Sequence, residues 1–167
     1  MFRTRILSAL ALTASFTMPS YAADNGLPSH KYLPIALAND AAMTALATCT
    51  KQGYNVTVIV DDRYGDIRLM LVGDGVRNLN DVTKRKAYTA VKRATSSGDY
   101  AKFLASRPAG TPGAIAPDPN MIASQGGLPI VVDGDTIGSI AVGGAPGGDK
   151  DEACAAEGLA KIKDRLK

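Results

Sequence analysis

The sequence predicts an α+β domain in which helices flank an antiparallel sheet. Two strongly apolar, β-branched stretches are each joined by a turn to a second apolar stretch, the pattern of a β-hairpin, at 55–72 and 128–142. Stretches with apolar residues at helical spacing lie before, between and after these hairpins. Because both strand pairs are hairpins, no parallel crossover is required, and we expect an antiparallel sheet.

The amino-terminal half is expected to be a helix followed by a hairpin. Apolar residues at helical spacing run from Ile35 to Gln52, after a proline that suits a first helical turn. Residues 55–60 become almost continuously apolar, which favours a buried strand, and 67–72 form its partner. The turn at 61–66 contains three aspartates, which could suggest a cation site. Their spacing is not that of an EF-hand, so a hairpin turn is the preferred interpretation.

Two helices and a loop are expected next. Residues 80–94 combine a narrow apolar stripe with many basic side chains, and either a solvated face or an anion-binding face would explain the basic residues. A short helix is predicted at about 98–106. The segment 107–120, rich in Pro and Gly, is interpreted as a loop within the domain. The short helix is expected to turn its larger apolar side chains inward: Tyr100, Phe103 and Leu104.

A second hairpin and a last helix complete the domain. Asp133-Gly134 is a strong hairpin-turn signal between two apolar stretches. The glycine-rich segment 143–148 could present backbone N–H groups to an anion, but a tight turn is the preferred interpretation. Residues 149–167 carry acids early and bases late, the order that the helix dipole favours.

The amino terminus resembles a secretory signal peptide. Two arginines precede the apolar segment 6–18, which is too short to span a bilayer, since a spanning helix needs about 20 residues. Small residues then lead to Ala22. We expect cleavage after Ala22, or alternatively after Ala23; a retained membrane anchor is the other alternative.

Three segments follow from this interpretation: a signal peptide at 1–22, a flexible lead-in at 23–34 and a single domain at 35–167. The mature protein would be periplasmic or secreted, with no stable membrane insertion after cleavage.

Composition excludes several classes of function. The 167 residues carry a formal net charge of +3 with both signs interspersed, so no nucleic-acid footprint is present. The single histidine, His30, excludes a multi-histidine metal site and leaves no convincing Ser/His/Asp arrangement. The residues therefore favour a binding protein over an enzyme, although an enzyme stays open.

The two cysteines, Cys49 and Cys154, both lie in the predicted domain. An even count in an oxidising compartment favours a disulfide. Two buried free thiols, packing as small apolar side chains, are the alternative.

Several motifs together resemble one known family. They are Val58-Ile-Val-Asp-Asp-Arg-Tyr-Gly65, Gly73-Asp-Gly75, Lys86-Ala-Tyr-Thr-Ala90, Gly126-Gly-Leu-Pro-Ile130, Ile137-Gly-Ser-Ile-Ala-Val-Gly-Gly144 and Gly144-Ala-Pro-Gly-Gly-Asp-Lys-Asp-Glu152. In this order and spacing, over about residues 35–165, the sequence is similar to the GlcG/HbpS family.

The resemblance implies a profilin-like fold with an antiparallel sheet of about five strands and helices on both faces. It also implies a homo-oligomer built from dimers and non-covalent binding of haem or a related tetrapyrrole, for sequestration or sensing. An enzyme or accessory protein acting on a small organic acid or aldehyde is the alternative function.

The same resemblance suggests a haem site. It places Thr95, with Ser96 beside it, at the haem, while Lys86 and Arg93 would pair with propionates. His30 could act as the histidine found near the amino terminus of some members. A structural alternative for Thr95 is to cap the helix that begins near Gly98.

Overall fold

The computed structural model of the chain describes residues 29–76, 79–108 and 118–167. The chain divides into two units, Met1–His30 and Lys31–Lys167, and the second unit holds the helices and strands described below. The expected signal peptide and most of the lead-in lie outside the described residues. Within the described ranges, no helix combines the length and apolar character needed to cross a membrane.

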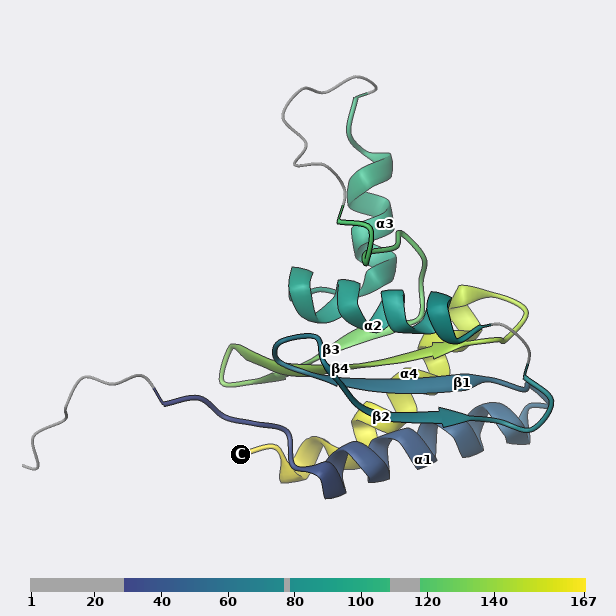
Figure 1. The fold of residues 1–167 in the computed structure, drawn as a ribbon, viewed down its shortest axis with the longest axis horizontal. Helices are drawn as coiled ribbons and strands as arrows, with labels where there is room; N and C mark the ends of the chain where they lie inside the picture. The colour runs from purple at the N-terminus through teal and green to yellow at the C-terminus, as the bar shows by residue number, and fades with distance from the viewer. Residues whose placement is uncertain (1–28, 77–78, 109–117) are drawn as a thin grey trace, which may run out of the picture. The chain divides into compact units, whose positions relative to one another are not determined.

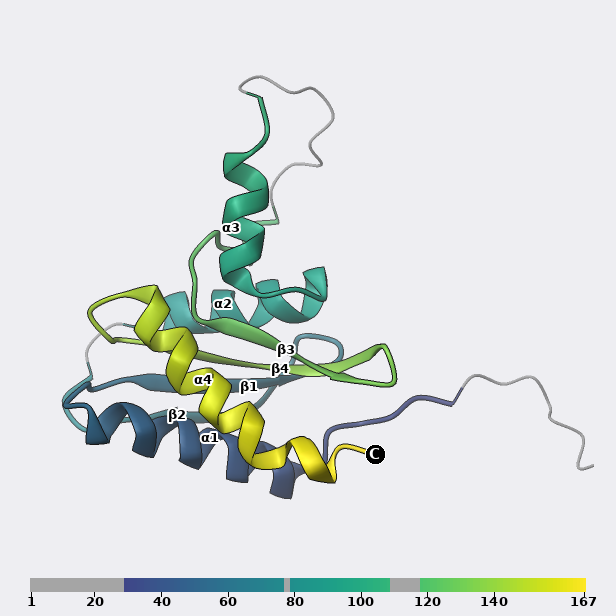
Figure 2. The ribbon, with the colours of Figure 1, turned by 180° about the vertical axis from the view of Figure 1, so that it is seen from behind.

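The compact unit has the sheet as its middle layer (Figure 1). Helices α1 and α4 lie side by side on one face, and α2 lies on the other (Figure 2). Helix α3 follows α2 and projects away from the sheet. The helices are α1 (Ile35–Lys51), α2 (Asn80–Arg93), α3 (Ser97–Ala105), α4 (Gly148–Ile162) and a terminal 3-10 turn η1 (Lys163–Arg165).

The sheet has the order β2-β1-β4-β3, with every neighbouring pair antiparallel. Both predicted hairpins are confirmed. The described residues contain four strands, so the expectation of about five strands, which the resemblance implied, is wrong. Residues 121–126, which lead into β3, form no strand. The strands are β1 (Thr57–Asp62), β2 (Ile67–Val72), β3 (Gly127–Val132) and β4 (Asp135–Gly143).

Burial explains which strands are central. β1 is buried on both faces up to Asp61, as its apolar run at 58–60 predicts, and β4 is buried on both faces from Ile137 onward, where its residues are apolar or small. β2 is an edge strand whose side chains alternate between half-buried and exposed. The pair β1–β4 therefore joins the two hairpins, with Thr57 opposite Gly143 and Asp61 opposite Ser139.

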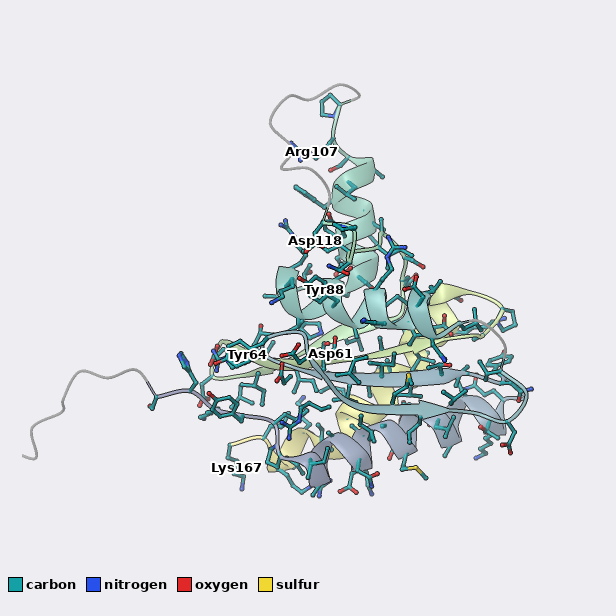
Figure 3. The ribbon with its side chains drawn as sticks, viewed as in Figure 1. Asp61, Tyr64, Tyr88, Arg107, Asp118 and Lys167 are labelled. Carbon is teal, nitrogen blue, oxygen red and sulfur yellow. A yellow bond between two sulfur atoms is a disulfide. The ribbon has the colours of Figure 1, made fainter. Side chains whose placement is uncertain are left out.

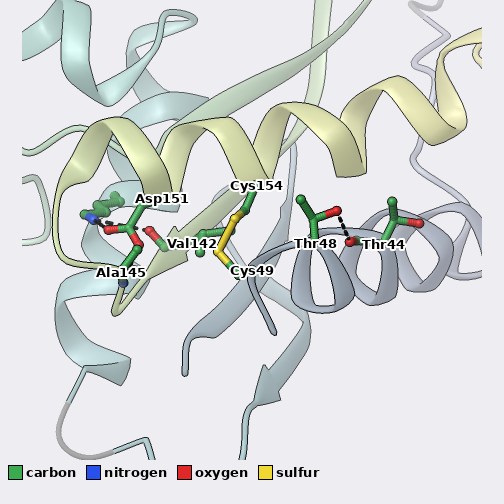
Figure 4. Close-up of a disulfide and its surroundings, with 8 residues drawn as sticks. Thr44, Thr48, Cys49, Val142, Ala145, Asp151 and Cys154 are labelled. Carbon is green, nitrogen blue, oxygen red and sulfur yellow. Dashed lines mark hydrogen bonds and ion pairs between the residues drawn. A yellow bond between two sulfur atoms is a disulfide. The ribbon is translucent and has the colours of Figure 1, made fainter. Parts of the chain in front are cut away.

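The face covered by α1 and α4 is dry. Its core is a single cluster of aliphatic side chains from both helices and from the sheet, including Val58, Val60 and Ile140. Small residues bring the helices together, since a Cβ on Gly158 of α4 would collide with the carbonyl oxygen of Ala41 in α1. The helices are also linked covalently by the disulfide Cys49–Cys154, with Cα atoms 5.7 Å apart (Figure 4).

The face covered by α2 is different. Its apolar cluster contains only Ile59, Ala87 and Ala141. Between α2 and the sheet, polar side chains bond directly across the layer: the Thr57 hydroxyl donates to Asn80 Oδ1, and the Ser139 hydroxyl donates to the Ala87 carbonyl.

Candidate functional site

Helix α2 lies directly on the backbone of the sheet. A Cβ on Gly127 would collide with the Lys86 carbonyl, and one on Gly143 would collide with Thr83 Oγ1. Because glycine stands at both places, the helix approaches β3 and β4 closely. This approach buries one stripe of α2 and leaves its opposite stripe, with Lys84 and Tyr88, on the outside of the layer.

Lys86 belongs to the buried stripe. Its ammonium donates to Asp151 Oδ2 at 2.7 Å and to the Val142 carbonyl at 3.2 Å, and both side chains of the ion pair are about 95% buried (Figure 4). Asp151 Oδ1 accepts from the backbone N–H of Ala145. Burial raises the pKa of the Asp151 carboxyl, and the hydrogen bond from Lys86 opposes that shift. The structure thus places Lys86, expected at a propionate, inside the protein.

The Asp151 carboxylate also contacts the glycine-rich segment 143–148. The N–H of Ala145, which could have faced an anion, already donates to Asp151. This contact supports the tight-turn interpretation of 143–148.

At the corner between α2 and α3, arginine side chains lie over aromatic rings. The Arg93 guanidinium lies 5.2 Å from the ring centre of Tyr100 and 5.9 Å from that of Phe103. Arg107, labelled in Figure 3, lies 5.7 Å from the Phe103 ring centre. We call Arg93, Tyr100, Phe103 and Arg107 the Arg–aromatic cluster. Neither arginine is in an ion pair within the part of the chain that the structure describes.

Two side chains of α3, Phe103 and Leu104, contradict a sequence expectation, whereas Tyr100 is half-buried. Phe103 is 48% exposed and Leu104 is 38% exposed, so their predicted inward orientation is wrong. The physical reason is that α3 projects beyond α2 and has no sheet beneath its outer turns.

The structure separates the roles of Thr95 and Ser96. Ser96 caps α3, its Oγ accepting from the Asp99 N–H at 2.9 Å. The capping alternative proposed for Thr95 is therefore wrong by one residue. Thr95 is half-buried, and its hydroxyl makes no hydrogen bond within the described residues. His30 is exposed and belongs to the first unit of the chain, whereas the cluster belongs to the second.

Beside α2 lies a hollow of about 580 Å³. It is bounded by α2, by the β1–β2 turn and by the segment that begins at Asp118. Hydrogen bonds fix the last of these walls, since the Tyr88 hydroxyl donates to Asp118 (labelled in Figure 3) and Arg85 Nη2 donates to the Met121 carbonyl. The lining residues are Gly65, Asp66, Ile67, Asp81, Lys84, Arg85, Tyr88, Pro119 and Asn120.

Polar groups near this hollow are left unsatisfied. Both carboxylate oxygens of Asp61 and the Nε of Arg85 are buried without a hydrogen-bond partner in the described ranges. Asp61 lies opposite Ser139 and Ile67, on the sheet face toward α2. Its burial, and then the charge of Asp62, raise the pKa of Asp61 to about 7, against the opposing charge of Lys84.

The β1–β2 turn itself is held by a carboxylate. Asp62 Oδ1 accepts from the backbone N–H groups of Tyr64 and Asp66, as the hairpin interpretation requires. Across the described residues, no three His, Cys, Asp or Glu side chains gather as metal ligands.

Sequence reasoning missed the buried position of Asp61, which it placed in the turn although the residue lies in β1, and it did not single out Arg85. In the Arg–aromatic cluster it named Arg93 as a candidate haem contact, but not Tyr100, Phe103 or Arg107. Asp61 could have been found, because it continues the alternation of Thr57 and Ile59 on a strand whose run of apolar residues already indicates burial. The cluster joins residues from two helices and from the turn after α3, and its assembly depends on the angle between the helices.

These observations describe an α+β domain with a dry core on one face of its sheet and a ligand-sized hollow on the other. The chain belongs to the HbpS-like family, described as haem degrading protein HbpS-like, whose model matches residues 33–160.

Solved structures agree with this assignment. A double mutant of HbpS from Streptomyces reticuli is 33% identical, with a TM-score of 0.74 over 87% of this chain and 97% of that chain. Another structure of HbpS is 34% identical, with a TM-score of 0.73 over 81% and 93%. A PduOC–haem complex is 18% identical, with a TM-score of 0.69 over 79% and 96%, which shows the fold alone. No match was found among curated protein sequences.

Proposed function

We propose that this protein binds haem non-covalently at the Arg–aromatic cluster, for sequestration or sensing. The observation that carries the proposal is the position of two guanidinium groups over aromatic rings at the α2–α3 corner, where Phe103 is exposed and Tyr100 is half-buried. The membership in the HbpS-like family supports it, and so does the PduOC–haem complex, in which a protein of the same fold is paired with haem.

The cluster fits the chemistry of haem. Haem presents a flat aromatic macrocycle and two carboxylates. Phe103 and Tyr100 offer ring surfaces for stacking, and Arg93 and Arg107 offer planar donors that pair with carboxylates in two-point geometry. Lys86 has no part in this proposal, because Asp151 already holds its ammonium.

Few side chains are available to the iron. Both cysteines are in the disulfide, and the sequence contains one histidine, His30. We propose Thr95, whose hydroxyl makes no hydrogen bond at this corner within the described residues, as the axial group. Bound haem would supply redox-active iron, and the cluster would hold and orient it.

Export and assembly are part of the same proposal. We propose that residues 1–22 direct export and are removed after Ala22 or Ala23, and that the mature chain forms a homo-oligomer built from dimers. Intact mass of the protein recovered from the periplasm or medium tests the first statement, and light scattering tests the second.

The test of haem binding is a visible-spectrum titration of the purified protein with haemin. A saturable Soret shift is expected, with affinity reduced at least about tenfold in Arg93→Ala/Arg107→Ala. Arg68→Ala, which removes an exposed arginine from the edge strand, is the matched control. Equal loss in the control, or a response that does not saturate, would overturn the proposal.

Two further variants locate the iron ligand. A changed Soret position in Thr95→Ala identifies Thr95 as the axial group, whereas a change in His30→Ala with none in Thr95→Ala would reject Thr95. Because the family is described as haem degrading, the band is also followed with time. A stable band fits sequestration or sensing, whereas progressive loss of the band would indicate turnover.

A further inference from the structure

The hollow beside α2 is chemically distinct from the Arg–aromatic cluster. Four of its lining side chains are charged, two of each sign: Asp66, Asp81, Lys84 and Arg85. Three of them lie on one helix at spacings that commonly give ion pairs, with Asp81 three residues before Lys84 and four before Arg85. None of the four is in an ion pair within the described part of the chain.

Contacts within the protein hold the walls of the hollow in place without a ligand. Arg85 is held at the Met121 carbonyl, and Asp66 is positioned by a turn whose backbone bonds to Asp62. Gly65 packs against the Tyr88 ring, where an added Cβ would lie only 2.8 Å from a ring carbon. A preformed site loses less conformational entropy when a ligand binds.

The guanidinium of Arg85 is the second indication of a ligand. Arg85 lines the hollow, and its Nε is buried without a hydrogen-bond partner among the described residues. The charge of Arg85 also lacks a carboxylate partner in the described residues, so an anionic group in the hollow would pair with the guanidinium. Besides Gly65 and the polar Asn120, the remaining lining is apolar or aromatic, with Ile67, Tyr88 and Pro119.

We propose that this hollow binds a small zwitterion of the α-amino acid type. The carboxylate of the ligand would pair with Lys84 and Arg85, and its ammonium would pair with Asp66 and Asp81. An apolar side chain would lie against Ile67 and Tyr88. A dianion such as phosphate fits less well, because two carboxylates share the same walls with the two cations.

The first experiment is an NMR titration of the isotopically labelled protein with each of the common L-amino acids. The Nε–H resonance of Arg85 reports directly on the hollow. At least one amino acid, with an apolar side chain, is expected to shift it in a saturable way. Absence of a saturable shift with every amino acid would overturn the proposal.

Matched ligands then test both charges. L-phenylalanine is compared with 3-phenylpropanoate, which lacks the ammonium, and with 2-phenylethylamine, which lacks the carboxylate; if another amino acid binds more tightly, its own acid and amine are used. Each analogue is expected to bind at least about tenfold more weakly. Equal binding of either analogue, or tighter binding of inorganic phosphate, would overturn the zwitterion assignment.

Variants test the location. Lys84→Gln and Asp81→Asn, both at exposed positions, are each expected to weaken amino acid binding about tenfold. Lys161→Gln, an exposed lysine on α4, is the matched control and should bind normally. Unchanged affinity in Lys84→Gln would place the ligand elsewhere and reject the site. Haemin binding by Lys84→Gln should be unchanged, which keeps this result separate from the proposed haem site.

Discussion

The two faces of the sheet differ in what they bury. Under α1 and α4 lies one continuous aliphatic cluster, closed by a disulfide. Under α2 the apolar cluster has three members, and most of the fully buried polar side chains gather there or on α2 itself: Thr57, Asp61, Thr83, Lys86, Thr89 and Ser139. Apolar burial drives folding, whereas a buried polar group stabilises only when its bonds are satisfied.

The difference indicates that one face of the sheet stabilises the fold and the other carries the candidate binding sites. The dry face supplies the stability that lets the other face keep an unpaired carboxylate at Asp61 and an unpaired donor at Arg85, as far as the described residues go. The hollow and the Arg–aromatic cluster both lie on the α2 side. We therefore expect substitutions on the face covered by α1 and α4 to change the stability of the protein. Substitutions on the outer side of α2, in the hollow or in the Arg–aromatic cluster, are expected to change ligand binding.

The largest loss of stability is expected from removing the disulfide. Cys49→Ala/Cys154→Ala should lower the free energy of unfolding by about 4–5 kcal/mol in the chain-entropy model, because the bond closes a long loop with a sequence separation of 105. Urea unfolding measures the change. Reduced wild type should match the variant, and a loss below about 1 kcal/mol would show that the helix packing is sufficient without the bond.

Breaking the buried ion pair should be nearly as damaging. Lys86→Met leaves Asp151 buried and unpaired, and a loss of about 3–5 kcal/mol is expected in urea unfolding. The double variant Lys86→Met/Asp151→Leu should recover much of the lost stability, since it leaves no buried charge without a partner. Lys84→Met, at an exposed position on the same helix, is the control and should change little. If the single and double variants were equally unstable, charge burial would not be the cause.

Asp61 gives a prediction about pH. Its folded pKa of about 7 lies above its ordinary value of 3.8, so the folded state binds the proton more tightly. The stability that Asp61 contributes is complete below about pH 4 and is lost as pH rises toward 7, by up to about 4 kcal/mol. Asp61→Asn lacks this loss and should be the more stable protein at pH 8.

Unfolding of both proteins at pH 5 and pH 8 checks this statement. Asp164→Asn, at an exposed carboxyl in η1, controls for a simple change of net charge. Parallel pH profiles for wild type and Asp61→Asn would mean that Asp61 finds a partner in solution.

The smallest effect concerns the packing of the dry face. Gly158→Ala places a methyl group against the Ala41 carbonyl and should cost about 1–3 kcal/mol, despite the better helix propensity of alanine. Glu157→Ala, exposed on the same helix, is the control. A stabilised Gly158→Ala would show that α1 and α4 can move apart freely.

Local patterns were sufficient for the secondary structure. The helical spacing of 35–52 and the two hairpins were predicted, because each depends on residues close together in the chain. Local pattern did not show that α3 lacks a sheet beneath it, so Phe103 was assigned to the core although it is exposed.

The site was harder to predict because it depends on distant pairs. The run Lys84-Arg85-Lys86 looks uniformly basic, yet one lysine enters the protein and the other two cations line the hollow. Helical spacing could have marked Lys86, since Thr83 and Ala90 lie on the same buried stripe. Its partner Asp151 lies on another helix, and no local signal connects the two.

The order of the strands has a consequence for how the protein folds. Each hairpin can form from neighbouring residues, but β1 meets β4 only after the two halves of the chain come together, and such non-local pairing is slow. Each half contributes one cysteine, Cys49 before the first hairpin and Cys154 after the second. Oxidation of this pair is therefore a chemical reporter of the docking step, and trapping free thiols during refolding would time the assembly of the sheet.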